Sequence, residues 1–558
     1  MRPLRGNLMD RRRLLAAALF LPATIATPVP AAAVKEPPRP ALMVLISVDQ
    51  LVPAYFDRYG AQLEGGLKRL ISEGRVYTNA DLGYAMSATG PGHATLGTGT
   101  YPSTSGIIGN EWIDPATRKE MYCVGDPEAQ KVEGEGNGLS PKNLLVDGLG
   151  DWLKAARPGA KVISVGGKDR SAILLGGKHP DGAYWYNGST GHMVSSTYYF
   201  PSQLAPWARS FNAADWIAHN TPDAWTKLLP ESAYAADGPD DFHAEANGGD
   251  ARTFPHPLDP KQKAKAQMTS PFWDRLLLDF ALTAVREEKL GRHGAPDLLT
   301  IALSATDYVG HTYGPDSHEA HDNFLRLDRS LGEFLSKLEN EVGRGNLIVA
   351  LSADHSVMPN PEFTVEIRHG AARRIKYGEA IKPKVELLDA AIRADVKADG
   401  PVLQMDPWGS GGFLDAAAAA KGGVSPPDLE RRVREGLLKI DGVVDVFFRD
   451  ELESARTASR PYLESFRRSY NAPRSEDFTV LYCESCLVAT SLLTAEHGSP
   501  YAYDTRVPLI LWGRSVAAGR DASAVRTVDV APTLARAAGV APGKSAEGSV
   551  LPGAFSAN

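Results

Sequence analysis

Short apolar runs that end at polar residues constrain the fold of this 558-residue chain more than any other feature. The first run, Leu42–Val48, is almost purely aliphatic and stops at Asp49. An apolar run of this length without polar alternation is typical of a strand in a parallel sheet that is covered on both faces. The candidate central strands are Leu42–Val48, Lys161–Val165, Leu298–Ser304, Leu347–Ser352 and Pro508–Trp512.

Amphipathic helical patterns separate these runs. Pro141–Ala156 and Asp322–Val342 both place apolar residues at helical spacing along one face. Alternation of strands and helices predicts an α/β fold with a mostly parallel central sheet flanked by helices. In an open sheet of this kind the ligand crevice lies at the carboxyl ends of the strands, so polar residues that follow the strands are candidates for a site.

Two segments depart from this pattern and are interpreted as insertions in one large domain that spans residues 41–558. The segment at about 187–272 is rich in Ser, Tyr, Trp, Pro, Asp and Asn, with little periodicity. It is predicted to form a cap over the crevice rather than part of the sheet. The segment at about 383–452 contains a helical pattern at 427–438 and a short apolar run at 442–448. It is predicted to form a small α+β subdomain.

The N-terminus has the features of a secretory signal peptide over residues 1–33. Arg11–Arg13 precede the apolar stretch Leu14–Leu21, and the small residues Ala31–Ala33 follow. The adjacent arginines also resemble a twin-arginine export signal. Residues 34–40 are rich in proline and are predicted to form an extended linker. We therefore expect a periplasmic or secreted protein, with no stable membrane insertion after the signal is removed.

Charge and cysteine content argue against several classes of protein. Removal of residues 1–33 takes away five Arg and one Asp, which changes the formal charge from −7 to about −11. A basic surface that binds nucleic acid is therefore not expected. Three cysteines are too few for a disulfide scaffold. Cys483 and Cys486 form either a local disulfide or two half-buried thiols, and the sequence does not decide between these alternatives.

Carboxylates and imidazoles follow several of the predicted strands. Alone, each of these residues has a simple structural explanation as a helix cap, a turn residue or a buried histidine. Together, three Asp and three His form the ligand mixture expected for two zinc sites with open positions, rather than for calcium or magnesium alone. The candidate metal ligands are Asp49, Asp307, His311, Asp354, His355 and His497.

A glycine-rich segment from Ser87 to Pro102 is predicted to open a helix, with Thr89 at the cap and Pro91 in the first turn. Backbone N–H groups at a helix start favour an anion, so a hydroxyl at that point lies beside a phosphate-binding position. A nearby cation would stabilise Thr89 as an alkoxide and make it a nucleophile. A purely structural role as an N-cap is the alternative for Thr89.

Other histidines lie in or near these segments. His93 follows Thr89 by one helical turn and is assigned to packing and to support of the site rather than to chemistry. Histidines in polar segments are expected at the surface or at the rim of the crevice, and they are His243, His256, His318 and His321.

Seven motifs along the chain support a comparison with known families. They are Val48-Asp49-Gln50, Thr89-Gly-Pro-Gly-His93, Gly106-Ile-Ile-Gly-Asn110, Gly167-Lys168-Asp-Arg170, Thr306-Asp307-Tyr-Val-Gly-His311, Ala353-Asp354-His355 and His497-Gly498. Together they resemble the alkaline phosphatase superfamily, and in particular its phosphate-irrepressible alkaline phosphatases, which are related to the nucleotide pyrophosphatase/phosphodiesterases. The resemblance covers most of residues 42–512.

The resemblance implies an exported alkaline phosphatase that hydrolyses phosphate monoesters. It further implies two Zn²⁺ ions per chain and a covalent phosphothreonine intermediate at Thr89. The implied ligands of one zinc ion are Asp307, His311 and His497. The implied ligands of the other are Asp49, Asp354, His355 and the oxygen of Thr89.

The resemblance also assigns Asn110, Lys168 and Arg170 to the non-bridging oxygens of the phosphoryl group. A monoester dianion carries one more charge than a diester, so charge-assisted hydrogen bonds from Lys168 and Arg170 favour a phosphatase. A phosphodiesterase or nucleotide pyrophosphatase is the alternative that shares both metal sites. A non-catalytic protein that binds metal or phosphate is the alternative from another class. The natural ester and the oligomeric state are not determined by the sequence.

Overall fold

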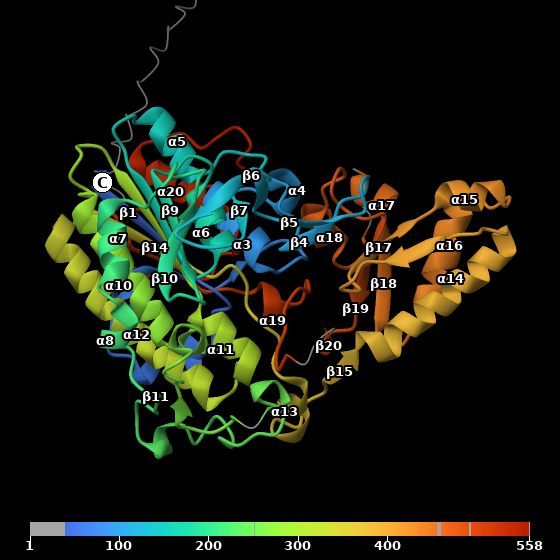
Figure 1. The fold of residues 1–558 in the computed structure, drawn as a ribbon, viewed down its shortest axis with the longest axis horizontal. Coiled ribbons are helices and arrows are strands. Elements are labelled where there is room, and N and C mark those ends of the chain that lie inside the picture. The colour runs from blue at the N-terminus through green and yellow to red at the C-terminus, as the bar shows by residue number, and fades with distance from the viewer. Residues whose placement is uncertain (1–38, 250, 455–458, 490–492, 557–558) are drawn as a thin grey trace, which may run out of the picture. The chain divides into compact units, whose positions relative to one another are not determined.

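The computed structural model describes residues 39–249, 251–454, 459–489 and 493–556. The predicted signal peptide and most of the predicted linker lie outside the described residues. A sheet of 11 strands organises the fold (Figure 1). In spatial order the strands are β22 (Gly519–Asp521), β2 (Arg75–Tyr77), β21 (Leu509–Gly513), β14 (Leu347–Ser352), β1 (Leu42–Val48), β13 (Asp297–Leu303), β8 (Val162–Gly166), β9 (Gly182–Asn187), β10 (His192–Ser196), β6 (Gly125–Val132) and β7 (Asn137–Leu139).

The centre of this sheet is parallel and its flanks are largely antiparallel. Strand β1 pairs in parallel with β13 on one side and β14 on the other, and β8 continues the parallel order beyond β13. Every residue of these four strands is buried, as their aliphatic sequences predict. The predicted α/β fold is confirmed, but the sheet as a whole is mixed. Strand β21, predicted as one of the central strands in a parallel sheet, runs antiparallel to both β14 and β2.

Two groups of helices pack against the central strands (Figure 1). One group is α2 (Gly66–Glu73), α10 (Phe272–Glu287) and α12 (His318–Val342). The other group is α3 (Thr89–Thr98), α5 (Leu149–Ala156), α6 (Asp169–Gly176) and α20 (Val530–Ala538). None of the helices in the described residues combines the length and apolar character that a membrane crossing requires.

Two local predictions are wrong. The prediction of a helix over Pro141–Ala156 holds only from Leu149, because the helix begins where the side chain of Asp151 accepts the N–H of Gly148 at 2.8 Å. The prediction that residues 187–272 lie outside the sheet fails at β10, which pairs antiparallel with β9. The remainder of this segment forms short elements, namely α7 (Pro206–Ala213), α8 (Trp216–Asn220), β11 (Ala224–Trp225), β12 (His256–Pro257) and α9 (Lys263–Ala266).

A second, smaller sheet has its own hydrophobic core. Its strands in spatial order are β16 (Leu403–Met405), β17 (Gly411–Leu414), β19 (Phe478–Tyr482) and β18 (Val443–Phe448). Helices of this region are α14 (Lys382–Val396), α15 (Ala416–Lys421) and α16 (Pro426–Leu437). The core of buried residues runs from Ile375 to Val480, so this α+β unit extends beyond the predicted segment at both ends.

Candidate active site

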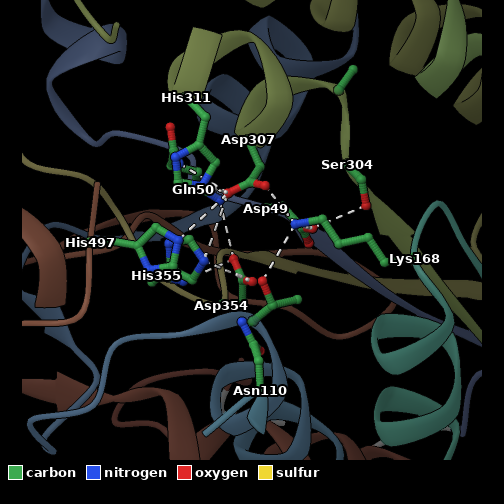
Figure 2. A network of polar contacts seen from close by, with 12 residues as sticks. Asp49, Gln50, Asn110, Lys168, Ser304, Asp307, His311, Asp354, His355 and His497 are labelled. Atoms are coloured by element: carbon green, nitrogen blue, oxygen red, sulfur yellow. Dashed lines mark hydrogen bonds and ion pairs between the residues drawn. The ribbon is translucent and has the colours of Figure 1, made fainter. Parts of the chain in front are cut away.

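Three carboxylates meet at the carboxyl ends of neighbouring parallel strands. Asp49 follows β1 directly, Asp354 lies two residues after β14, and Asp307 lies in α11 (Ala305–Tyr313), which follows β13. The pairing of β14, β1 and β13 brings these strand ends to one edge of the sheet. All three carboxylates are buried and converge on one point (Figure 2).

Three imidazoles lie beside these carboxylates, on the side opposite Lys168 (Figure 2). In His311, His355 and His497 the Nδ1 atom contacts a backbone carbonyl oxygen, which only accepts a hydrogen bond. Each ring is therefore held with Nδ1 as a donor, and its Nε2 lone pair is left for a ligand. The acceptors are the carbonyl oxygens of Ala495, Ser356 and Ser87, at 2.8, 2.9 and 2.6 Å respectively.

The Nε2 atoms of these rings face the carboxylates. Nε2 of His311 lies 3.3 Å from Oδ1 of Asp307, and Nε2 of His497 lies 3.9 Å from the same oxygen. Nε2 of His355 lies 3.3 Å from Oδ2 of Asp354, and its ring stacks on that of His497 with 3.6 Å between centroids. The structure thus brings all six predicted ligands into one cluster.

Two groups in this cluster have the spacing of a metal site, with ligand atoms within 4.8 Å of one another. The first is Asp307, His311 and His497, and the second is Asp49, His93 and Asp354. His93 bridges the second pair, with Nε2 at 3.1 Å from Asp49 and Nδ1 at 3.4 Å from Asp354.

Buried ligand atoms in this cluster fit a bound cation. Oδ1 of Asp49, Oδ2 of Asp354 and Nε2 of His355 are buried and make no hydrogen bond, and the two carboxylate oxygens have histidine nitrogens at 3.1 to 3.4 Å as ion-pair neighbours. Burial of such atoms is unfavourable unless a charge or a metal compensates them. Mixed carboxylate and imidazole donors suit zinc, because imidazole is a poor ligand for calcium and magnesium.

Lys168 lies between the carboxylates of the two groups. Its Nζ atom is 2.7 Å from Asp49 and 2.6 Å from Asp307. Burial alone would raise the pKa of Asp49, but the charges of Lys168 and His93 outweigh it and hold that pKa below its ordinary value. Burial favours neutral His311, yet the charge of Asp307 raises the pKa of His311 to about 9. A metal ion that binds His311 would displace that proton.

The helix that carries Thr89 begins one residue earlier than predicted. Ala88 occupies the N-cap with an extended backbone and makes no side-chain cap, so Thr89 is the first helical residue rather than the cap. Asn110 supplies the acceptor that a capping side chain would otherwise provide, because its Oδ1 accepts the N–H of Gly90 at 2.7 Å. This contact leaves the amide Nδ2 of Asn110 as a donor beside the helix start. The hydroxyl of Thr89 lies 3.4 Å from Nζ of Lys168.

Arg170 belongs to the same edge of the site. Its Nη1 donates to the hydroxyl of Tyr122 at 3.4 Å, and its buried Nε has no hydrogen-bond partner. With Lys168, Tyr122 and Tyr308, it lines a cavity of about 610 Å³. A guanidinium whose donors are not fully used is available to an anion in that cavity.

Three supporting residues were not predicted. Nε2 of Gln50 donates to Asp307 at 2.9 Å, and Oγ of Ser304 donates to Asp49 at 3.0 Å. Asp274 accepts the N–H groups of Ser304 and Ala305, both at 2.9 Å, and so fixes the start of α11. Position after a strand was a usable signal for Gln50 and Ser304, whereas Asp274 lies inside α10 and nothing in its local sequence marks it.

The other histidines differ from prediction. His256, His318 and His321 are buried rather than exposed, and His256 and His321 pair with Glu319 and Asp237 at 2.7 and 2.6 Å. These carboxylates satisfy the rings inside the protein, so a polar local sequence did not mean exposure. His243 is exposed as predicted. Of the two alternatives for Cys483 and Cys486, the structure has the disulfide.

A family model for type I phosphodiesterase / nucleotide pyrophosphatase matches residues 43–421. This range contains Thr89, Lys168 and all of the predicted metal ligands except His497. The chain belongs to this family. Alkaline phosphatase PafA of Elizabethkingia meningoseptica is 31% identical over 510 residues, which cover 89% of this chain and 91% of the relative. Alkaline phosphatase PhoV of Synechococcus elongatus is 33% identical over 506 residues, which cover 89% of each chain.

Solved structures agree with these relatives. The crystal structure of wild-type alkaline phosphatase PafA superposes with a TM-score of 0.85 at 30% identity, and the match covers 93% of this chain and 99% of that chain. A second crystal structure of PafA matches equally well and carries substitutions of one threonine, one asparagine, one lysine and one arginine. The predicted place of the chain in the alkaline phosphatase superfamily is confirmed.

Proposed function

We propose that this chain hydrolyses phosphate monoesters, with Thr89 as the nucleophile. The observation that carries the proposal is the contact of the Thr89 hydroxyl with Lys168, at a helix start that adjoins two groups of potential metal ligands. The relatives that cover most of the chain are named alkaline phosphatases. The four residue types substituted in the PafA variant also recur here in the same order, as Thr89, Asn110, Lys168 and Arg170.

In this mechanism, the phosphoryl group of the ester lies over the N-terminus of α3. Thr89 gives up its hydroxyl proton to solvent and its oxygen attacks phosphorus. The bond from phosphorus to the alcohol oxygen breaks, that oxygen takes up a proton from water, and a phosphothreonine forms. Water then attacks the phosphothreonine and releases inorganic phosphate and free Thr89. Nδ2 of Asn110 and the guanidinium of Arg170 are directed to the non-bridging oxygens, where charge-assisted hydrogen bonds strengthen as charge shifts in the transition state.

We further propose two Zn²⁺ ions as cofactors. Bound at this site, they would lower the pKa of the hydroxyl and of water and stabilise charge on the leaving oxygen. The residues proposed to hold one ion are Asp307, His311 and His497, and those proposed for the other are Asp49, Asp354, His355 and Thr89, with His93 holding Asp49 and Asp354 in place. The three Nδ1 contacts to carbonyl oxygens support this assignment, because they orient Nε2 toward the carboxylates.

A monoesterase is favoured over a diesterase by the charge beside the nucleophile. Lys168, whose ammonium contacts Thr89, and Arg170 line the same cavity. A monoester dianion gains more from two cations than a diester monoanion does, because it carries one more charge. A phosphodiesterase would gain less binding energy from these two cations, because its substrate carries one negative charge fewer.

A comparison of two substrates tests the proposal. We expect the wild-type protein to hydrolyse nitrophenyl phosphate with a much higher kcat/KM than methyl nitrophenyl phosphate. Arg170→Ala should reduce this preference by about tenfold or more, because the dianionic monoester loses more than the monoanionic diester when a cation is removed. Thr89→Ala should abolish turnover of both. A wild-type preference for the diester would reject the monoesterase, and near-normal turnover by Thr89→Ala would reject the nucleophile.

We also propose that the protein is exported to the periplasm or secreted. The features of residues 1–33 support this proposal, and the disulfide between Cys483 and Cys486 is typical of an oxidising compartment. N-terminal sequencing of protein recovered from outside the cytoplasm should begin near Val34. A protein that retains Met1 and stays in the cytoplasm would contradict the proposal.

A further inference from the structure

A second cavity opens from the candidate active site toward the small sheet. It has a volume of about 340 Å³ and is lined at one end by Ala88, Asn110 and His497, which adjoin the nucleophile and the first metal group. At the other end it is lined by Trp408 and Glu476 of the smaller α+β unit. A phosphate ester held at Thr89 can therefore extend its alcohol part into this cavity. The volume lies near the lower limit for ligand pockets, which favours a small alcohol.

Six of the residues that line this cavity are aromatic. Their faces carry negative electrostatic potential, which attracts an organic cation more than a neutral group of the same shape. The aromatic residues that line the cavity are Trp112, Trp408, Phe466, Tyr482, Tyr501 and Tyr503.

The charged side chains in this wall are all acidic. Among the described residues that line the cavity, four are carboxylic acids and none is Lys or Arg, the acids being Glu111, Glu476, Glu496 and Asp504. Burial and the nearby charge of Asp406 raise the pKa of Glu476 to about 8. Asp504 is 1% exposed, and its Oδ1 atom has no hydrogen-bond partner.

One basic residue, Arg474, contacts Trp112 without lining the cavity. The guanidinium of Arg474 lies over the ring of Trp112 with 5.3 Å to the centroid, but Arg474 is not among the lining residues. It donates to the carbonyl oxygens of Gly106 and Asn143, so its donors are directed away from the carboxylates of the cavity. No Lys or Arg among the described lining residues therefore pairs with these acids, although the charge of Arg170 acts on Glu111 and that of His311 acts on Glu496.

We infer that this cavity receives the alcohol part of a phosphate monoester that carries a quaternary or protonated amine. Aromatic rings favour an ammonium group over a neutral group of the same shape. Above about pH 8, where Glu476 is ionised, its carboxylate adds to this preference and disfavours a second phosphate or carboxylate on the substrate. The inference rests on the proposed function and adds a substrate class to it: small amino-alcohol phosphates, with the phosphoryl group at Thr89 and the ammonium beside Glu476.

Two esters of equal shape test the inference. Phosphocholine and tert-butylethyl phosphate differ in a quaternary nitrogen that is replaced by a quaternary carbon. At about pH 9, where Glu476 is ionised, we expect the wild-type kcat/KM to be about tenfold higher or more for phosphocholine, the size of effect that a desolvated cation–π contact produces. Glu476→Gln should lower this ratio several-fold. Glu435→Gln, which removes an exposed carboxylate paired with Arg431 in the same unit, should leave the ratio unchanged.

Choline itself gives a readout that does not require turnover. Calorimetric titration at the same pH should detect binding of choline and much weaker binding of tert-butylethanol, with the difference reduced in Glu476→Gln. Equal kcat/KM values for the two esters, together with equal binding of the two alcohols, would overturn the inference while leaving the phosphatase in place. Failure to hydrolyse nitrophenyl phosphate would instead overturn the proposed function, and the titration would still decide whether the cavity selects a cation.

Discussion

Substitution of Gly92 by alanine tests whether the position of α3 relative to the metal ligands determines activity. A Cβ atom at Gly92 would lie 2.3 Å from the carbonyl oxygen of Asp354 and 2.6 Å from its Cβ. Carbon atoms in contact are normally about 3.5 Å or more apart, so α3 and the segment of Asp354 must separate by about 1 Å. Neither contact is the end of a flexible side chain. The strain therefore falls on the backbone that carries Thr89, three residues before Gly92.

The two energetic effects of this substitution oppose each other. Alanine is favoured over glycine inside a helix by about 1 kcal/mol, whereas overpacking of a closed interior costs about 1–3 kcal/mol. Because the clash involves backbone atoms, we expect the overpacking to prevail and Tm to fall by a few degrees. A displacement of about 1 Å between nucleophile and metal ligands should lower kcat by about a hundredfold. Loss of activity should thus exceed what the modest loss of stability explains.

The assay is kcat/KM for nitrophenyl phosphate, with Tm measured on the same samples. Gly60→Ala is the matched control, because Gly60 has a helical backbone and a Cβ atom there would meet nothing within 4 Å. This control should keep wild-type activity and Tm. If Gly92→Ala behaved like the control, the close approach of α3 to Asp354 would not be required for the site.

Two further predictions concern metal and pH. Removal of metal by a chelator should abolish hydrolysis and lower Tm, because metal bound to the native site stabilises the fold. Addition of zinc should restore both, with about two ions bound per chain. Full activity after chelation, or purified protein without zinc, would contradict the metal assignment. Glu476 keeps its proton up to about pH 8 in the folded protein but releases it near pH 4.5 in the unfolded chain. The free energy of unfolding that this proton contributes is therefore fully present below about pH 4.5 and is lost as pH rises to about 8. Glu476→Gln should therefore lose fewer degrees of Tm than the wild type between about pH 5 and about pH 8, and parallel Tm curves would contradict the raised pKa.

The elements that could be predicted from the sequence are those whose local pattern and final environment agree. Leu347–Ser352 is aliphatic up to its last residue and forms a strand buried on both faces, so its bounds were predicted without error. Strand β21 has the same aliphatic character, and its burial was predicted from it. Its direction could not be predicted, because antiparallel pairing with β14 depends on the path of the chain between these strands. Strand β10 contains His192, Ser195 and Ser196, and this polar composition concealed a place in the main sheet.

For the site, the identity of the carboxylate residues could be predicted from the sequence, but the orientation of the imidazole rings could not. Asp49, Asp307 and Asp354 were predicted because each follows a strand or the helix start after it, and parallel strands bring such positions together. The orientation of the imidazoles depends on partners remote in sequence. His497 is held by the carbonyl oxygen of Ser87, which precedes the nucleophile helix, and His311 is held by that of Ala495, beside His497. These contacts tie the nucleophile segment, α11 and the segment of His497 to one another. A change in the backbone at Ser87 would therefore alter both the nucleophile and the first metal group, which explains how residues so far apart in the chain can act as one site.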